Sequence, residues 1–356
     1  NKISLPAELN DEESGMVRMR DEMFRSEVLR AIGKGKTESN RAFKILQQLI
    51  INTLDSKANP RCTVYPDQIV WGRSPARLDI AGGWSDTPPY CLQEGGSVVN
   101  IAIEMNGQPP IQCYIRLAKE HCIVMRSIDN GVMERVETYE ELAGYNSVGS
   151  AFCIPKAALC LAGFHPHFCS REYSSLKEQL RQLGGGLEIT LLVAIPKGSG
   201  LGTSSILAST VLGALSDFCG LGWTKQQICH RTLILEQLLT TGGGWQDQYG
   251  GVFAGVKLCE SESGAQSNIA VKWLPEHLFS NNEYQGRWLL YYTGITRVAK
   301  NILEAVVRGM FLNEAKRISI IDAIKNHSYA MVEAIQRSDF EEVGKLMRRS
   351  WRLNCQ

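Results

Sequence analysis

The chain has 356 residues, of which 44% are hydrophobic, and its 38 Lys and Arg against 37 Asp and Glu give a formal net charge of +1. This length predicts two domains with substantial cores. The basic residues do not cluster, which argues against a nucleic-acid partner, and no apolar run is long enough to span a membrane. Eleven cysteines without a CxxC pair indicate reduced thiols and a cytoplasmic protein.

A charged helical segment is predicted over residues 1–66. Apolar side chains at Phe43, Leu46 and Ile50 would share one helix face. Gly-Lys-Thr at 35–37 imitates the end of a Walker A loop, but a helix rather than a strand precedes it. We therefore interpret the segment as a helical extension or linker.

From residue 68 the pattern changes to strands and turns, followed by helices. A Gly- and Ser-containing stretch over residues 260–267 is interpreted as a domain boundary. An N-terminal domain is therefore predicted over 67–266 and a C-terminal domain over 267–356. The strands expected include residues 69–71, 98–104, 111–117, 121–128 and 288–292.

The most informative segment is a glycine-rich loop, PKGSGLGTSS, over residues 196–205. An apolar run over 187–195 predicts a buried strand before it, and small and apolar residues over 204–216 predict a helix after it. Backbone N–H groups at such a helix N-terminus bind phosphate when glycines allow a close approach. The loop is neither a dinucleotide-binding GxGxxG, which needs glycine at Thr203, nor a Walker A loop.

A second segment, RSPARLDIAGGWSDTPPY, covers residues 73–90. Its strand carries Arg77 and Asp79 and ends at two glycines, which would expose Trp84 and Asp86 on a tight turn. A carboxylate beside an indole suits a sugar, because the acid accepts hydroxyls and the ring covers an apolar face. Taken alone, a structural turn with a half-buried Trp is an equally good interpretation.

Two further carboxylates, Asp247 and Glu236, are candidates for functional residues. The segment TTGGGWQDQYGG, over residues 240–251, places no charged residue within four positions of Asp247, so an ionic partner must come from elsewhere in the chain. Dense glycine suggests close backbone approach to a ligand, with a structural turn as the alternative. Glu236 lies beside an apolar stripe on the preceding helix, where a carboxylate is usually a solvated flank residue.

In their order along the chain (73–90, 196–205 and 240–251), these three segments resemble the signatures of the GHMP small-molecule kinases, which include galactokinase, homoserine kinase, mevalonate kinase and phosphomevalonate kinase. The resemblance spans about residues 70–296. Within the family, AGGWSDTPP and GGGWQDQYGG are most similar to L-fucokinases, especially the kinase half of bifunctional fucokinase/GDP-fucose pyrophosphorylases. The resemblance implies an α+β fold with an S5-like N-terminal domain, a ferredoxin-like C-terminal domain and an active site in the cleft between them.

The resemblance also implies roles for individual residues. Asp247 matches the family's catalytic aspartate, which also contacts the sugar, and Arg77 matches the arginine near that carboxylate and the transferred phosphate. Asp86 matches a sugar-binding aspartate, with Gly83 and Trp84 beside it. Galactokinase has Glu-His at these last two positions, so this chain lacks an acceptor there and gains an apolar surface.

ATP and Mg²⁺ are implied in the same way. Ser204 and Glu236 match the magnesium ligands of mevalonate kinase, and Glu236 precedes Asp247 by eleven positions, as it does there. Magnesium is expected to bridge the β- and γ-phosphates. The residues expected to bind the ATP phosphates are Lys197, Gly198, Ser199, Gly200, Leu201, Gly202, Thr203 and Ser204.

The reaction implied is transfer of the γ-phosphoryl group of ATP to the anomeric hydroxyl of L-fucose, which gives L-fucose 1-phosphate for salvage toward GDP-fucose. The family's third motif, a glycine-rich GAGxGG, is absent from the sequence, so the C-terminal domain is expected to be incomplete. The resemblance to the bifunctional enzymes is compatible with covalent fusion to a nucleotidyltransferase domain in the full-length protein.

Two alternatives stay open. A D-glycero-D-manno-heptose 7-phosphate kinase would need cations for the phosphate that its substrate already carries, and no Lys/Arg cluster lies near Asp86. A catalytically silent sugar sensor could use the same fold, but retention of Asp247, Arg77, Ser204 and Glu236 together favours an enzyme.

Overall fold

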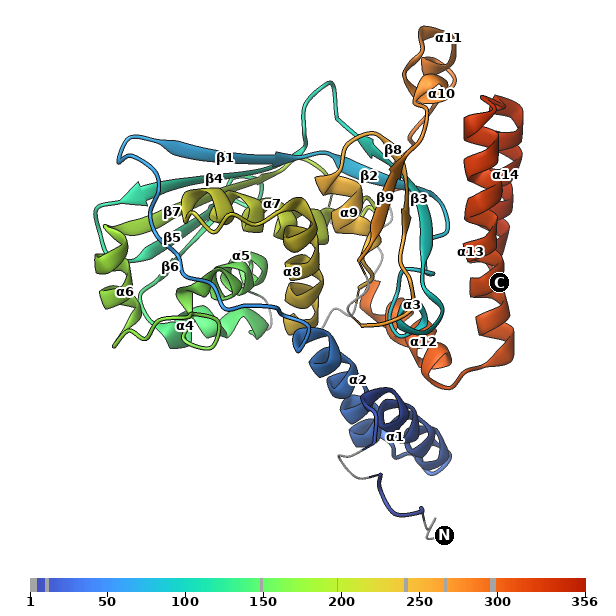
Figure 1. The fold of residues 1–356 in the computed structure, drawn as a ribbon, viewed down its shortest axis with the longest axis horizontal. Helices are drawn as coiled ribbons and strands as arrows, with labels where there is room; N and C mark the ends of the chain where they lie inside the picture. The colour runs from blue at the N-terminus through green and yellow to red at the C-terminus, as the bar shows by residue number, and fades with distance from the viewer. Residues whose placement is uncertain are drawn as a thin grey trace.

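A computed structural model describes residues 5–9, 13–147, 150–196, 198–239, 243–265, 268–294 and 299–356. Two sheets with helices packed against them confirm the predicted α+β class (Figure 1). One sheet has five strands in the order β1-β4-β7-β5-β6, and the other has four in the order β2-β3-β8-β9. The strands are β1 (Ile69–Ser74), β2 (Ala76–Ala81), β3 (Ser97–Ile103), β4 (Ile111–Ala118), β5 (Ile123–Ser127), β6 (Val132–Val136), β7 (Gly186–Val193), β8 (Val256–Glu260) and β9 (Ala270–Trp273).

The helices lie before, between and after these strands. They are α1 (Gly15–Arg30), α2 (Lys36–Ile51), α3 (Tyr90–Glu94), α4 (Tyr139–Ala143), α5 (Cys153–Leu159), α6 (Leu176–Leu183), α7 (Thr203–Phe218), α8 (Lys225–Leu238), α9 (Gln246–Val252), α10 (His277–Ser280), α11 (Asn282–Gln285), α12 (Ala299–Phe311), α13 (Ala315–Gln336) and α14 (Phe340–Asn354). The longest of them, α13, lies beside α14 at one end of the molecule (Figure 1).

The strand and helix predicted around the glycine-rich loop are confirmed as β7 and α7. Alternate residues of β7, including Leu187, Ile189 and Leu191, are buried in the main core. The strand runs parallel to β5 and antiparallel to β4. Helix α7 packs across β1 and β4, with Leu212 and Leu215 fully buried. The loop between β7 and α7 is thereby held against the end of a packed sheet.

The four-stranded sheet is covered on both faces. Ile80, Ile101 and Leu258 form one core cluster with residues of α13 and α14, such as Met331 and Leu346. The opposite face packs against α9, which contacts β2 and β3. This packing fixes α9 against the strand that carries the arginine singled out in the sequence.

The C-terminal part differs from the expectation in two ways. Strand β9 pairs with β8 across the predicted boundary at residue 266/267, with Lys257 opposite Trp273, so the two predicted domains share a sheet. The described residues after β9 form helices and no strand of a ferredoxin-like sheet. The strand predicted over 288–292 is wrong, because this apolar run has no paired neighbour among the described residues and Leu289 is 87% exposed.

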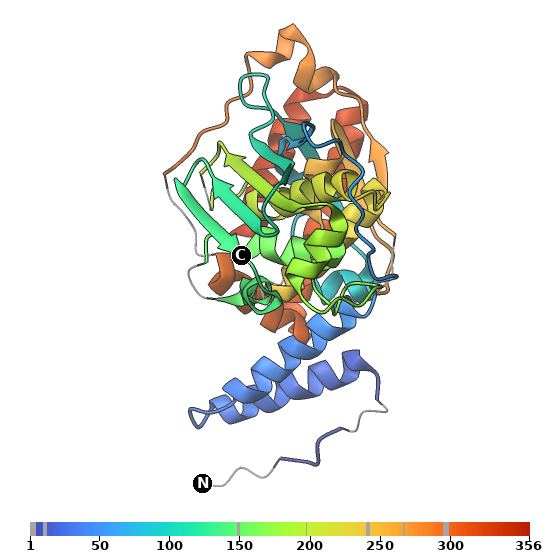
Figure 2. The same ribbon diagram turned by 90° about the vertical axis from the view of Figure 1, so that its left-hand side faces the viewer.

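The predicted N-terminal helical extension is present as a hairpin of α1 and α2, which projects from the body in both views (Figures 1 and 2). Met19 and Met23 of α1 pack in the same cluster as Leu46 and Ile50 of α2. Helix α2 also contacts α8, so the hairpin is joined to the helices that flank the site.

All eleven cysteines lie within the described residues and are free thiols, as expected for reduced cysteines. Most of them are buried, while Cys355 is exposed. In the part of the chain that the structure describes, no helix is long and apolar enough to cross a membrane.

Truncation of Leu212 tests this packing. Because its side chain is fully buried between α7 and the five-stranded sheet, Leu212→Ala is expected to lower the free energy of unfolding by about 2–5 kcal/mol, measured by urea denaturation. Val17→Ala, at a position that is 47% exposed on α1, should change it by less than about 0.5 kcal/mol. Equal losses for the two variants would contradict the assigned core.

Candidate active site

Three helices meet close to strand β2. Helices α7, α8 and α9 contact one another, and α9 also contacts β2. The first turn of α9 carries Asp247, the last turn of α8 carries Glu236, and β2 carries Arg77. The fold therefore brings together candidate residues that are up to 170 positions apart in the sequence.

Arg77 is the ionic partner of Asp247. Its Nε donates to Asp247 Oδ1 at 2.7 Å, and its Nη2 donates to the same oxygen. The Arg77 backbone N–H donates to Leu201 O at 3.3 Å, and its Nη1 donates to Gly200 O at 3.4 Å. Burial opposes the charge, but Asp247 and Asp79 outweigh it and raise the pKa of Arg77. One guanidinium thus links β2, α9 and the glycine-rich loop.

The glycines of the loop are required by its backbone conformation. Gly198, Gly200 and Gly202 have φ values of 72°, 81° and 75°, which are left-handed and costly for other residues. A Cβ at Gly202 would also lie 3.1 Å from Asp247 Cγ. The loop can therefore approach the Asp247 carboxylate and lead directly into α7.

Two side chains of the loop are left without partners. Ser199 Oγ and Thr203 Oγ1 are buried, with no hydrogen-bond partner among the described residues. Unpaired buried hydroxyls at a helix N-terminus suit a phosphate ligand, which accepts hydrogen bonds. Lys197, another predicted phosphate-binding residue, lies outside the described residues.

The hydroxyl beside Glu236 belongs to Ser205. Its Oγ donates to Glu236 Oε1 and lies 3.5 Å from Asp247 Oδ2. Ser204 is exposed at the neighbouring position of α7, and its metal-binding role stays a prediction. Ser205 was not among the residues predicted for the site, although its spacing of four residues from the buried Ser209 places it on the inner helix face.

Glu236 is a buried acid with a strongly perturbed titration. Burial raises its pKa to about 8, the hydrogen bond from Ser205 opposes this, and the charges of Asp247 and Asp86 add to the rise. Gly243 leaves room for it, because a Cβ there would lie 2.2 Å from Glu236 Oε2. Burial thus excludes the alternative that Glu236 is a solvated flank residue, and its metal-binding role stays a prediction.

A divalent cation fits this surrounding. Mg²⁺ prefers oxygen ligands and commonly binds one or two carboxylates together with substrate phosphates. Glu236 and the neighbouring hydroxyls supply such oxygens, and a cation would favour the ionised form of this acid. Among the described residues, no group of three His, Cys, Asp or Glu side chains is placed to hold a metal, so phosphate oxygens would have to complete the site.

Asp86 is buried below the start of α9. It is 1% exposed, and its Oδ2 accepts the Gln246 backbone N–H at 3.0 Å. Its Oδ1 accepts hydrogen bonds from Trp84 N at 3.1 Å and Gln246 Nε2 at 3.2 Å. Burial, together with nearby carboxylates, raises its pKa to about 7. Asp86 thus holds the turn and the helix that carries Asp247 in place, while direct sugar binding stays a prediction.

The neighbouring turn is strained at Trp84. This half-buried residue has a φ of 83°, which is uncommon for a bulky side chain and is held here by the Trp84 hydrogen bond to Asp86. Gly83, by contrast, has no left-handed φ; instead, Asp79 packs against it. Asp79 was predicted to lie on the strand, without a role in the site.

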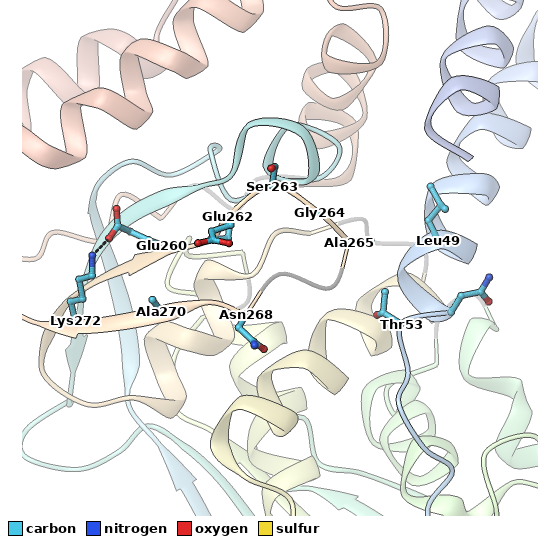
Figure 3. A pocket seen from close by; sticks show the side chains of 12 residues that line it. Leu49, Thr53, Glu260, Glu262, Ser263, Gly264, Ala265, Asn268, Ala270 and Lys272 are labelled. Atoms are coloured by element: carbon cyan, nitrogen blue, oxygen red, sulfur yellow. Dashed lines mark hydrogen bonds and ion pairs between the residues drawn. The ribbon is translucent and has the colours of Figure 1, made fainter. Parts of the chain in front are cut away.

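An open hollow of about 1030 Å³ lies elsewhere, between α2 and the β8–β9 connection (Figure 3). Its lining includes Leu49 and Thr53 on one side and Glu260 and Lys272 on the other, and the last two form an ion pair of 2.6 Å. None of the residues that line it is Arg77, Asp86, Glu236 or Asp247. The hollow is therefore separate from the candidate active site.

Comparison with known proteins agrees with this geometry. Residues 170–255 match the family model described as GHMP kinases N terminal domain. The chain is 54% identical over 354 residues to the L-fucokinase/L-fucose-1-P guanylyltransferase of Bacteroides fragilis, an alignment that covers 99% of this chain and 37% of that protein. It is 27% identical over 281 residues to the D-glycero-alpha-D-manno-heptose 7-phosphate kinase of Campylobacter jejuni, covering 79% of this chain and 75% of that protein.

The fold is similar to that of Methanococcus jannaschii mevalonate kinase, with a TM-score of 0.55 and 15% sequence identity over 80% of this chain and 78% of that one. The chain belongs to the GHMP kinases. It spans 37% of the length of the Bacteroides relative, whose name gives two activities.

Glu236 should make stability depend on pH in the absence of metal and nucleotide. Its pKa in the folded state, about 8, lies above the ordinary 4.5, so folding favours the protonated acid. Stability from this group is present at low pH and is lost as pH rises from about 4.5 to 8. Glu236→Gln should remove this loss. At pH 9 its free energy of unfolding, measured by urea denaturation, should exceed that of the wild type by at least about 1 kcal/mol.

The matched control is Glu120→Gln, at an exposed acid outside the site. It should keep the wild-type dependence on pH. If the free energy of unfolding of Glu236→Gln falls with pH as steeply as that of the wild type, the raised pKa of Glu236 does not contribute to stability.

Proposed function

We propose that the chain is an ATP-dependent sugar kinase that phosphorylates the anomeric hydroxyl of L-fucose to give L-fucose 1-phosphate. The observation that carries the kinase reaction is the Asp247 carboxylate, fixed by Arg77 beside a glycine-rich loop and the N-terminus of α7. The identity of the sugar is supported by the 54% identical relative, whose name begins with L-fucokinase.

The chemistry follows from the two oxygens of Asp247. Oδ1 is occupied by Arg77, whereas Oδ2 faces the Ser205 hydroxyl at 3.5 Å and would be the one to accept a proton. The acceptor hydroxyl would lose its proton to Oδ2 as its oxygen bonds to the γ-phosphorus and the bond to the β–γ bridging oxygen breaks. Arg77 would also offset phosphate charge, because its Nη1 lies at the loop.

The nucleotide would bind through the glycine-rich loop, whose N–H groups and helix dipole favour phosphate. Glu236, with Ser204 or Ser205, would hold Mg²⁺, which neutralises phosphate charge in such kinases. The thiol state of the cysteines supports a cytoplasmic location. Fusion to a nucleotidyl-transferring part, as the name of the Bacteroides relative suggests, would supply the next step toward a nucleotide sugar.

The alternatives are less well supported. The heptose 7-phosphate kinase is only 27% identical, and Asp86 accepts hydrogen bonds from Trp84 and Gln246 rather than from cations that would bind a second phosphate. A silent sensor would not need the intact ion pair between Arg77 and Asp247. Turnover of ATP with free sugars and sugar phosphates separates the three functions, and L-fucose should be the substrate.

Replacement of the catalytic carboxylate is the first functional test. Asp247→Asn should lower kcat by at least about two orders of magnitude, because the amide cannot accept the proton. The affinity for an ATP analogue, measured by calorimetry, should stay within about twofold. Asp67→Asn, an exposed control, should retain full activity. Near-normal turnover by Asp247→Asn would remove Asp247 from the reaction.

The sugar preference provides a second test. L-galactose carries a hydroxyl where L-fucose has a methyl group, and this hydroxyl would lose its partners against the Trp84 ring at a cost of roughly 1–3 kcal/mol. We expect kcat/KM to favour L-fucose by about tenfold or more. Trp84→Ala should narrow the ratio. Equal use of both sugars by the wild type would reject the methyl contact but leave the kinase reaction intact.

A further inference from the structure

Asp79 is an acidic residue that the proposed reaction does not yet use. It lies two positions after Arg77 on β2, so both side chains point to the same face of the strand. Two residues of a strand span roughly 6–7 Å, which is about the size of a sugar ring with its hydroxyls. Asp79 therefore lies about one sugar ring away from Arg77, the residue that holds Asp247. As a whole residue Asp79 is exposed, unlike Asp86, which is 1% exposed, although protein atoms surround its carboxyl group.

Gly83 keeps space open for this carboxylate. A Cβ at Gly83 would lie 1.9 Å from Asp79 Oδ2 and 3.2 Å from Gln246 Nε2. Because Gly83 does not have a left-handed φ, its backbone conformation does not require glycine. The space itself is the requirement, and the Asp79 carboxylate occupies it.

The surrounding groups leave hydrogen-bonding capacity for a ligand. Gln246 donates its Nε2 to Asp86, and its Oε1 is buried with no hydrogen-bond partner among the described residues. Asp79 accepts backbone hydrogen bonds from Gly83 and Ala81, while burial among protein atoms and the charge of Asp247 raise its pKa. Capping the turn needs only a neutral acceptor, such as the Asn side-chain oxygen, and does not explain a carboxylate kept close to Asp247.

We propose that Asp79 is a specificity-determining residue of the acceptor site, where its carboxylate accepts a hydrogen bond from a ring hydroxyl of the sugar other than the one phosphorylated. This inference rests on the proposed sugar kinase function. Gly83 has no side chain that could accept a hydrogen bond from the sugar, and Asp79 supplies this acceptor at the same turn. The sugar would lie between Asp79 and Asp247, with one hydroxyl at each carboxylate.

The test compares L-fucose with its 2-, 3- and 4-deoxy analogues in the full-length protein. In the wild type, loss of the hydroxyl that Asp79 binds should lower kcat/KM at least about tenfold. In Asp79→Ala, L-fucose and that same analogue should be used about equally, because the partner of the hydroxyl is gone. Asp79→Asn keeps a neutral acceptor for the turn and should show intermediate discrimination. The KM for ATP should change less than about twofold.

Two matched variants complete the experiment. Gly83→Ala places a methyl group against the Asp79 carboxylate and should reproduce the loss of discrimination without removing the acid. Asp217→Asn, at the exposed far end of α7, should retain the wild-type pattern.

Each outcome decides the inference. If Asp79→Ala discriminates among all three analogues as the wild type does, Asp79 has no role in specificity, and the kinase assignment is unaffected. If kcat/KM of the wild type is as high for all three deoxy analogues as for L-fucose, none of the tested hydroxyls is recognised and the inference also fails. If the wild type phosphorylates no free sugar, the proposed function fails and the inference fails with it.

Discussion

The site depends on the ion pair between Arg77 and Asp247. Because the same guanidinium also donates to the carbonyl of Gly200, and its backbone N–H to that of Leu201, one side chain and its backbone join β2, the glycine-rich loop and α9. These elements are far apart in the sequence, and the two sheets and α7 bring them together. A displaced Arg77 would therefore affect the glycine-rich loop and the Asp247 carboxylate at once, because both are hydrogen-bonded to it.

The second constraint is crowding of negative charge. Asp79, Asp86 and Glu236 all have raised pKa values, and in each case burial is the main cause and Asp247 adds to it. Gly83 makes room for Asp79, and glycines at 243 and 244 make room for Glu236 and Asp86, since a Cβ would lie within 2.2 Å of a carboxylate oxygen in each case. Such a cluster is costly without cations, so the charge of a magnesium ion, as proposed for this site, would stabilise it.

Local patterns predicted part of this arrangement. The strand, loop and helix around PKGSGLGTSS follow from periodicity and glycine content, and the lack of charged neighbours around Asp247 indicated a distant partner. The rest depends on tertiary packing. Burial of Asp86, the choice of Ser205 beside Glu236, and the space that Gly83 leaves for Asp79 all involve segments that are remote in sequence. The run at 288–292 has strand-forming residues, but a strand also requires a partner.

A double-mutant cycle tests the central claim most directly. Arg77→Met, Asp247→Asn and the double variant of the full-length protein would be compared with the wild type by kcat/KM for L-fucose. Because Arg77 acts in part by holding Asp247, the loss of kcat/KM in the double variant should be smaller than the product of the two single losses by at least about threefold. Losses that multiply fully, so that the double variant falls by the product of both single effects, would show that the two residues act independently and would contradict the account.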